Sequence, residues 1–388
     1  MADKESSLSK IQRLISEQKN IRNVATSAHI HHGKCISGNS RVLLTDGTIK
    51  NAKEIFEDVS KEGFIYEDTE EHTIYMPNNV INVFSLNPDT NSIEKKPIQY
   101  AWRLKGGNTI KITLRNSFEI ASTPEHKYLV SRNGLEYVEA KDLKLGDRVV
   151  CARKLEFKSE QKIKKEILEK LSEKNFYVTL NTDFSKELNN KILLYGIKNI
   201  NTSVKPRSFY HGIWQNRYNI KDFLTICNLF NISLKEAYDK INYIYYRTGK
   251  QRGQNSLPIK LPQNFEDFFY LAGLFIGDGS GNKFVVGKEA LAKELERICE
   301  NLKIKTKRTK WKDKTPEIHT NQTLAELLNS LFDYPLRQKS HNVRISNFVW
   351  RSEDKFVGRL LRGYFDTDGC VEKSRRAITI SSASKIRY

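Results

Sequence analysis

The alternation of hydrophobic and polar positions predicts a helix and a strand near the N-terminus. Leu8, Ile11, Leu14 and Ile15 recur at helical spacing, because side chains three and four positions apart share one face of a helix. Residues 21–30 then have the apolar content of a strand, and Ala28 to Lys34 follow as a turn. We therefore expect a strand that leads directly into a loop.

From residue 35 the pattern changes to short strands. Residues 41–45 and 48–50 flank Asp46-Gly47, a dipeptide typical of a tight hairpin turn. Further strand-like runs follow, at residues 80–86, 109–114, 128–131 and 148–151. The pattern predicts a compact all-β domain over residues 35–152.

Residues 153–265 have a different character. A charged run at 154–170 precedes segments with helical patterns, at residues 208–215, 221–230 and 233–240. We expect a basic helical connector. Aromatic and basic side chains are interleaved in it, at Trp214, Arg217, Tyr218, Tyr243, Tyr245, Tyr246 and Arg247. This mixture suits phosphate contact and base stacking in DNA recognition, and packing in a core explains it as well.

Two segments of residues 266–388 share one local pattern. Residues 271–279 read LAGLFIGDG and residues 361–369 read LRGYFDTDG. As helices, both place small residues at i and i+4 on one face, where they permit close helix contact. Two such helices side by side would bring Asp278 and Asp368 together. An oxygen-rich site of this kind suits hard divalent cations such as Mg²⁺, and metal-assisted hydrolysis of phosphodiesters uses that arrangement.

Charge points to a polyanionic partner. The 388 residues carry 65 Lys and Arg against 46 Asp and Glu, a net charge of +19. Basic side chains that neutralise phosphates gain affinity by releasing counterions, so double-stranded DNA is the expected partner. A solvated basic surface is the alternative.

Cysteine usage and hydropathy indicate a reducing compartment. The five cysteines are widely spaced and contain no CxxC pair, which favours neither a disulfide framework nor a zinc cluster. No run approaches the roughly 20 apolar residues that span a bilayer, and the N-terminus lacks an apolar signal core. We expect a cytoplasmic protein without membrane contact.

The loop at residues 28–34 has the pattern [AG]-x4-G-K, the front half of a phosphate-binding loop. In such loops backbone amides cradle phosphates and a lysine reaches the outer ones, so Gly33 and Lys34 are the candidate nucleotide-binding residues. The hydroxyl residue that would hold magnesium is missing, because Cys35 follows Lys34.

Residues 11–34, IQRLISEQKNIRNVATSAHIHHGK, closely resemble the start of archaeal elongation factor 2, a family of GTP-binding proteins of protein biosynthesis. The family usually has an aspartate where His31 stands, and its loop continues into a helix. The resemblance therefore implies GTP only for a host protein in which the loop is complete.

Residues 35–152 resemble the N-terminal splicing region of inteins, the Hint-type domain. The opening block is matched by Cys35-Ile-Ser-Gly-Asn-Ser and a later block by Thr123-Pro-Glu-His126. The resemblance implies that the Cys35 sulfur attacks the Lys34 carbonyl in an N-to-S acyl shift, the autocatalytic start of protein splicing. It assigns His126 as the proton donor to the leaving amine and Thr123 as a group that polarises the carbonyl.

The paired motifs resemble LAGLIDADG homing endonucleases, which commonly lie inside inteins. The resemblance implies Asp278 and Asp368 as ligands of Mg²⁺, and Lys339 as a catalytic lysine. Ile276 replaces the usual inner acid of the first motif. Residues 303–314, with Trp311, are expected to form a strand pair that contacts DNA; a solvated basic hairpin is the alternative.

The expected fold is multidomain α+β. Its segments are a host segment at 1–34, an all-β splicing domain at 35–152, a connector at 153–265, and an αββαββ-type endonuclease domain at 266–388 that lacks most of its second repeat. Complete splicing by the family also needs a C-terminal His-Asn pair and a second nucleophile. Because the chain ends at Tyr388, we expect a complementary C-terminal intein fragment as a partner and no DNA cleavage by the chain alone. The rival interpretations are a DNA-binding protein with inactive nuclease motifs and a GTP-binding translation factor.

Overall fold

The computed structural model describes residues 35–87, 90, 92–115, 118–152, 155, 162–203, 206–248, 256–310, 315–336, 339–372 and 377–380. It divides the chain into two compact units, residues 1–158 and 159–388. The helix, the strand and the loop predicted before residue 35 lie outside the described residues.

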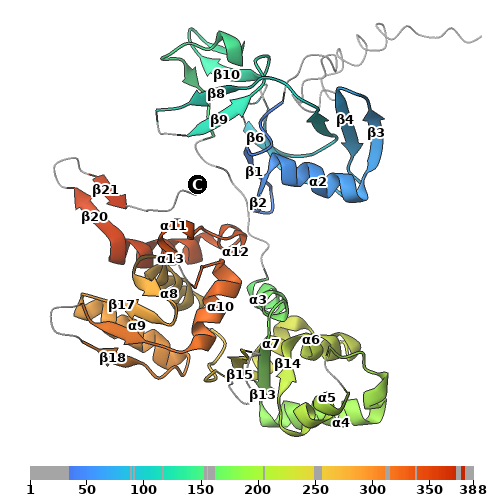
Figure 1. Cartoon of the computed structure of the whole chain (residues 1–388), viewed down its shortest axis with the longest axis vertical. Helices are drawn as coiled ribbons and strands as arrows, with labels where there is room; N and C mark the ends of the chain where they lie inside the picture. Colours follow the sequence, from blue (N-terminus) through green and yellow to red (C-terminus); the bar gives the residue numbers. More distant parts are fainter. Residues whose placement is uncertain are drawn as a thin grey trace, which may run out of the picture. The chain divides into compact units, whose positions relative to one another are not determined.

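The first unit is built from short antiparallel strands (Figure 1). Its elements are β1 (Arg41–Leu43), β2 (Ile49–Asn51), α2 (Ala52–Glu62), β3 (Phe64–Asp68), β4 (His72–Met76), β5 (Asn82–Asn87), β6 (Ser92–Pro97), β7 (Ala101–Leu104), β8 (Ile110–Thr113), β9 (Glu119–Ser122), β10 (Lys127–Ser131), β11 (Leu135–Glu139), η2 (Ala140–Asp142) and β12 (Arg148–Val149). The strands pair in the orders β1-β2, β3-β4-β7, β5-β6, β8-β9 and β11-β10-β12.

The predicted hairpin at Asp46-Gly47 is confirmed. Strands β1 and β2 pair antiparallel, with Leu43 opposite Ile49. The Asp46 side chain accepts a hydrogen bond from the Thr48 amide at 2.8 Å, and Gly47 has a φ of 84°, which glycine adopts without steric cost. The other four predicted strands of this stretch correspond to β5, β8, β10 and β12.

Helix α2 departs from the predicted all-β character of this stretch. Its apolar residues Ile55, Phe56 and Val59 are buried against the unit's small core. The helix starts with a capping box, because Glu54 reaches back to the Asn51 amide at 2.9 Å. Ile55 and Val59 are four positions apart, as on one face of a helix, so the sequence carried a helical pattern that the prediction of an all-β domain overlooked.

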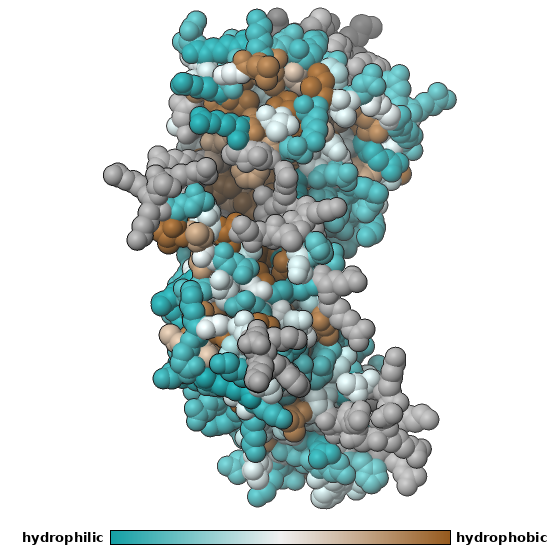
Figure 2. All heavy atoms as spheres, turned by 60° about the vertical axis from the view of Figure 1, so that its left-hand side comes forward, coloured by the Kyte–Doolittle hydropathy of each residue, from teal (hydrophilic) through white to brown (hydrophobic). Residues whose placement is uncertain are grey.

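Many large apolar side chains of the first unit are exposed. Figure 2 shows brown hydrophobic residues on the surface of the upper part of the view, where this unit lies. On the edge strand β3, Phe64, Ile65 and Tyr66 are each more than half exposed. The buried core here is correspondingly limited, with Leu44 and Ala101 joining the three residues of α2.

The second unit contains most of the helices (Figure 1). Its elements are α3 (Ile163–Ser172), β13 (Phe176–Leu180), α4 (Thr182–Tyr195), η3 (Ile197–Asn199), α5 (Pro206–Trp214), β14 (Tyr218–Asn219), α6 (Ile220–Leu229), α7 (Leu234–Lys240), β15 (Ile241–Tyr246), α8 (Phe265–Asp278), β16 (Gly279–Ser280), β17 (Lys283–Val285), α9 (Glu289–Asn301), β18 (Lys307–Thr309), β19 (Glu317–His319), α10 (Gln322–Phe332), α11 (Lys339–Asn342), α12 (Asn347–Trp350), α13 (Asp354–Asp368), β20 (Gly369–Glu372) and β21 (Ala377–Ile380).

The stretch predicted as a helical connector also contains a sheet. Helices α5, α6 and α7 lie where the sequence predicts them, and strands β14, β13 and β15 form an antiparallel sheet in that order. Strand β13 alternates buried and half-buried positions from Phe176 to Leu180, the period of a strand with one covered face. One hydrophobic cluster contains residues from Ile167 to Leu360, on both sides of residue 265. The boundary predicted near residue 265 therefore stays a prediction from the sequence.

The order of elements from α8 onward is α8-β16-β17-α9-β18-β19-α10, followed by α13-β20-β21. The two motif helices are α8 and α13, each followed directly by a two-strand hairpin, and α11 and α12 lie between α10 and α13. Strands β16 to β19 form one antiparallel sheet in the order β16-β17-β19-β18. Across the described residues, none of the helices combines the length and apolar character that a bilayer crossing requires.

Candidate functional site

Cys35 is held by the strand that precedes the Thr123 turn. The amide of Ser37 donates to the Ala121 carbonyl at 2.7 Å, and the Thr123 amide donates to the Cys35 carbonyl at 2.9 Å. The Cys35 amide donates in turn to Thr123 Oγ1 at 3.1 Å. The sequence separates these residues by 88 positions, and the fold brings the two predicted splicing blocks into direct contact.

The Cys35 side chain is half-buried, and burial raises the pKa of its thiol. A thiol attacks as the thiolate, and burial disfavours that charged form. The folded unit therefore keeps this sulfur protonated at neutral pH, so reaction depends on how well the sulfur is placed and on groups that take up its proton.

The turn after Thr123 positions His126. Its amide donates to the Thr123 carbonyl at 3.1 Å, and its carbonyl accepts from the Ala140 amide at 2.8 Å. The ring of Tyr128 lies edge-on to the His126 ring, with 5.0 Å between centroids. Tyr128 also donates to Ser122 Oγ at 2.9 Å. Both sides of the turn are thereby tied to the strand that holds Cys35.

Part of this candidate site lies outside the described residues. Gly33 and Lys34, the predicted nucleotide-binding residues, and His31 belong to that part. The contact predicted between Thr123 and the Lys34 carbonyl therefore stays a prediction. Among the described residues, the Thr123 hydroxyl accepts from the Cys35 amide nitrogen, the atom that leaves in an acyl shift, and donates to the Cys35 carbonyl at 3.4 Å.

A second candidate site lies in the other unit, where α8 and α13 pack side by side (Figure 1). A Cβ added at Gly273 would lie 2.0 Å from the Leu360 carbonyl oxygen, and one at Gly363 would lie 2.2 Å from the Tyr270 carbonyl oxygen. At Gly277 it would lie 2.0 Å from Thr367 Oγ1. The predicted close contact at small residues is confirmed, since no larger side chain fits at these crossings.

This packing places the aspartates that end the two helices near each other. Asp278 is the last residue of α8 and Asp368 the last of α13. Burial, and next to it the negative charge of Asp368, raises the pKa of Asp278. Two carboxylates held at short range disfavour their joint ionisation, and a bound cation would relieve that repulsion.

Lys339 lies at the same end of α8. Its Nζ donates to the carbonyl oxygens of Phe275 at 2.6 Å and Gly277 at 2.8 Å in the last turn of the helix, where carbonyls lack a full set of partners within the helix. Burial lowers the pKa of Lys339 to about 8, although the charges of Asp368 and Asp278 act in the opposite direction. The structure thus brings together all three residues that the sequence analysis selected here.

The ligand set for a cation at this end is small. Within the described part of the chain, His, Cys, Asp and Glu nowhere form a group of three or more that could hold a metal ion. A cation at Asp278 and Asp368 would therefore complete its coordination with water and substrate phosphates. Mg²⁺ commonly binds in this way, through one or two carboxylates.

Sequence reasoning missed a polar network along the same helix pair. Tyr270 donates to Asp366 Oδ2 at 2.8 Å, and the guanidinium of Arg359 lies over the Tyr270 ring at 5.0 Å. Burial raises the pKa of Tyr270, and its bond to Asp366 adds to that effect. Tyr270 directly precedes the first motif and Asp366 lies within the second. A single sequence, however, gives no reason to pair these two residues.

The aromatic and basic residues of the connector divide between core and surface. Tyr218 and Tyr245 are buried, whereas Trp214, Arg217 and Arg247 are exposed. The predicted basic strand pair is also present, since β18 and β19 pair antiparallel with Arg308 opposite Ile318. Trp311 lies outside the described residues.

Comparison with known protein families gives two matches. Residues 42–215 match the family described as the intein splicing domain. Residues 355–386 match the family described as the LAGLIDADG-like domain. The first match extends from β1 to α5, and the second covers most of α13 and the hairpin that follows it.

Among curated proteins, the chain is similar to elongation factor 2 of Methanopyrus kandleri, at 32% identity over 99% of this chain and 31% of that protein. It is also similar to a probable translation initiation factor IF-2 of Methanocaldococcus jannaschii, at 29% identity over 93% of this chain and 29% of that protein. The chain thus spans less than a third of the length of these relatives. A solved structure, that of the TvoVMA intein, is 25% identical over 30% of this chain and 69% of its own, and its TM-score of 0.28 is too low to carry an argument.

Proposed function

This chain joins an intein splicing domain to a LAGLIDADG-like domain. From this premise we propose that the first unit performs the acyl shift that starts protein splicing. We propose further that the second unit binds a divalent cation and DNA. The similarity to elongation factor 2 supports a translation factor as the host of the intein. The host's own GTP binding would belong to the protein after splicing.

In the acyl shift, the Cys35 sulfur attacks the carbonyl carbon of Lys34. The bond from that carbon to the Cys35 nitrogen breaks, a thioester forms at the sulfur, and the thiol proton ends on the freed α-amine. The observation that carries this proposal is the contact between the Cys35 amide and Thr123 Oγ1 at 3.1 Å. This contact fixes the leaving nitrogen beside the turn from Thr123 to His126.

The residues of this turn have separate tasks in the proposal. The Thr123 amide holds the Cys35 carbonyl at 2.9 Å, so the nucleophile's backbone cannot rotate away. His126 delivers a proton to the leaving nitrogen, which prevents the amine from attacking the thioester in return. Tyr128 supports the His126 ring from its edge.

The acyl shift is tested by adding dithiothreitol to the purified chain and following its mass. An external thiol captures the thioester, so residues 1–34 should be released from the wild-type chain and not from Cys35→Ala. Release of the same peptide from Cys35→Ala would overturn the assignment. A fall in release with Thr123→Val alone would agree with it.

In the second unit, Asp278 and Asp368 would hold Mg²⁺, with Lys339 at their side. The fit rests on the raised pKa of Asp278 and on the convergence of two helix C-termini, whose carbonyls favour a cation. A bound Mg²⁺ would neutralise charge on a scissile phosphate. The chain's own part is to orient the two carboxylates and to place the Lys339 ammonium near the phosphate.

Calorimetric titration with Mg²⁺ tests this site without any requirement for cleavage. The wild-type chain should bind the ion, and the double variant Asp278→Asn and Asp368→Asn should lose the heat signal. Equal signals in both proteins would contradict the site. Gel shifts with DNA from an uninterrupted elongation factor 2 gene then separate the alternatives: a DNA-binding protein with inactive motifs would bind equally with and without Mg²⁺.

A further inference from the structure

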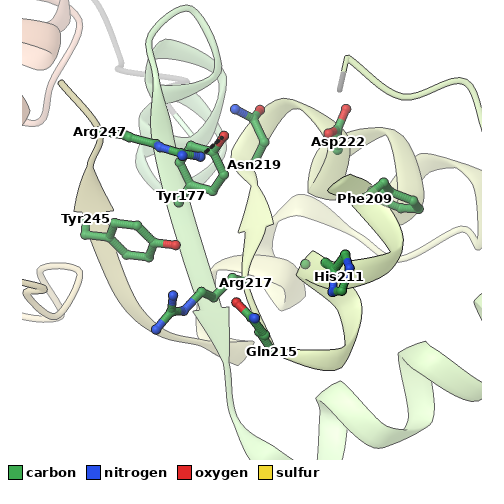
Figure 3. A pocket seen from close by; sticks show the side chains of 10 residues that line it. Tyr177, Phe209, His211, Gln215, Arg217, Asn219, Asp222, Tyr245 and Arg247 are labelled. Atoms are coloured by element: carbon green, nitrogen blue, oxygen red, sulfur yellow. Dashed lines mark hydrogen bonds between the residues drawn. The ribbon is translucent and has the colours of Figure 1, made fainter. Parts of the chain in front are cut away.

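A cavity of about 300 Å³ lies in the second unit, away from α8 and α13 (Figure 3). One side is the sheet β14-β13-β15, and the other is formed by α5 and the first turn of α6. The side chains shown in Figure 3 come from all of these elements and surround a common space. Neither the acyl shift nor the cation site uses any of them.

The register of the sheet places aromatic and amide groups on the face toward the cavity. Tyr177 on the central strand is opposite Asn219 on one neighbour and Tyr245 on the other, and residues directly opposite share one face. The rings of Tyr177 and Tyr245 are stacked, with 5.6 Å between centroids and 20° between planes. This face therefore brings a half-buried ring, Tyr177, and a buried ring, Tyr245, beside the amide group of Asn219.

A buried carboxylate lines the other side. Asp222 is 1% exposed, and its Oδ1 accepts a hydrogen bond from the Ser203 amide at 2.5 Å. Its Oδ2 is buried and has no hydrogen-bond partner among the described residues. A buried carboxylate oxygen without a donor is costly, so this atom is a place where a ligand's N–H group would be stabilised.

Two guanidinium groups stand at the same cavity. Arg247 lies over the Tyr177 ring at 5.6 Å and donates to the Tyr177 hydroxyl at 3.5 Å. Arg217 is close enough to Tyr245 to act on its hydroxyl electrostatically. Over the residues that the structure describes, neither arginine is joined to a carboxylate by an ion pair. Both are therefore available to an anionic ligand.

We propose that this cavity binds one nucleotide. Its phosphate is held by Arg217 and Arg247, its base lies against the aromatic surface of Tyr177 and Tyr245, and an N–H donor of the base meets Asp222 Oδ2. Stacking of a base on aromatic rings and binding of phosphate by arginine are both strong contacts in proteins that hold nucleotides. The cavity volume is at the lower end of the range of small-molecule sites, which suits a single nucleotide.

The same chemistry comes from two sources, a free nucleotide or one nucleotide of a single strand. Adenine is the base to use as a probe, because its exocyclic amino group can donate to Asp222. The probes are adenosine 5′-monophosphate, an eight-nucleotide single strand of deoxyadenosine, adenosine alone and inorganic phosphate. Isothermal titration of the full chain with each probe measures the affinity.

The variants are chosen to change one contact each. Asp222→Asn keeps the shape and replaces Oδ2 or Oδ1 with an amide that donates instead of accepting. Arg217→Gln removes one exposed cation at the cavity. Lys235→Gln removes an exposed cation from α7, which does not line the cavity, and serves as the matched control for charge.

We expect the monophosphate or the single strand to bind, and the tighter of the two identifies the source. Asp222→Asn and Arg217→Gln should each weaken that binding by about tenfold or more, and Lys235→Gln should leave it within about twofold. If Asp222→Asn does not fold, as judged by circular dichroism, Arg217→Gln alone decides, since Arg217 is exposed. The proposal is overturned if neither nucleotide probe binds, if inorganic phosphate binds as tightly as the monophosphate, or if Lys235→Gln weakens binding as much as Arg217→Gln.

Discussion

Cys35 and Thr123 are joined by three hydrogen bonds, one between backbone groups and two through the Thr123 hydroxyl. The Thr123 amide donates to the Cys35 carbonyl at 2.9 Å, and the Cys35 amide donates to Thr123 Oγ1 at 3.1 Å. The Thr123 hydroxyl donates in addition to the Cys35 carbonyl at 3.4 Å. The first bond is part of the backbone pairing, and the other two depend on the side chain. Substitution at Thr123 can therefore remove the hydrogen bond to the leaving nitrogen and keep the backbone hydrogen bond to Cys35.

Thr123→Val should slow thiol-induced release of residues 1–34 by about 10- to 100-fold. Valine keeps the shape and loses the hydroxyl, and loss of one polar group at a reacting centre has effects of this order. Mass spectrometry against time measures the rate. Thr109→Val at an exposed threonine of the same unit should leave the rate unchanged, and an equal loss in both variants would remove Thr123 from the site.

The rate of release should rise with pH. Burial raises the pKa of the Cys35 thiol, so below that pKa the thiolate fraction increases about tenfold for each pH unit. We expect the rate to climb from pH 6 to pH 9 without a plateau, when measured at a fixed concentration of thiolate from the added thiol. A plateau below pH 7.5 would contradict this, because Cys35 would then ionise more easily than an exposed cysteine, whose pKa is about 8.5.

Gly273→Ala should destabilise the second unit and weaken Mg²⁺ binding. The added methyl group would meet the Leu360 carbonyl oxygen at 2.0 Å, so α8 and α13 must separate and carry Asp278 away from Asp368. Overpacking of this kind costs about 1–3 kcal/mol of unfolding free energy. Thermal unfolding and calorimetry measure the two effects.

Gly358→Ala is the matched control for that change. Gly358 also lies in α13, and a Cβ there would meet nothing within 4 Å. Alanine is the better helix former, by about 1 kcal/mol at an interior position, so this variant should be as stable as the wild type or more stable. A loss of stability at Gly358 equal to that at Gly273 would show that the helix contact is not the cause.

The stability of the second unit should rise with pH because of Lys339. Burial lowers the pKa of Lys339 to about 8 in the folded chain, whereas the unfolded chain keeps the ordinary value for lysine. Between these two values the unfolded chain binds the additional proton, so raising the pH favours the folded state. The variant Lys339→Met has no titratable group at this position and serves as the reference.

The free energy of unfolding of the wild type, minus that of Lys339→Met, should therefore increase from pH 7.5 to pH 10, by on the order of 2 kcal/mol. Urea unfolding of both proteins at several pH values measures it. A difference that stays constant over this range would mean that the Lys339 ammonium is solvated in the folded chain.

The sequence predicted those parts of the fold that have a strong local signal. The Asp46-Gly47 turn needs a particular backbone geometry, and the repeated motifs of α8 and α13 have small residues at helical spacing. Helix α2 and strand β13 do have local patterns, but each lies in a stretch where the surrounding sequence favours the other type of structure. Their identity is decided by packing, which a single sequence does not display.

The candidate sites also differ in whether a local sequence pattern indicates them. Cys35, Thr123 and His126 could be selected because their blocks resemble a family, and Asp278 and Asp368 because their motif repeats. The cavity at Asp222 could be selected only in part: the sequence indicated Arg217, Tyr245 and Arg247 for phosphate contact and stacking, and gave no sign of Asp222. Its side chains come from β13, β14, β15, α5 and α6, and their proximity depends on strand order and on a carboxylate whose burial no pattern indicates.

Hydroxylamine trapping tests the central claim most directly. Hydroxylamine cleaves thioesters and leaves amides intact under mild conditions, so the purified chain should yield residues 1–34 ending in a hydroxamate at Lys34, together with a chain that begins at Cys35. Cys35→Ser and Cys35→Ala, folded as judged by circular dichroism, should yield no Lys34 hydroxamate at neutral pH. Recovery of only intact, folded wild-type chain after treatment would contradict the account, because the bond before Cys35 would then never leave its amide form.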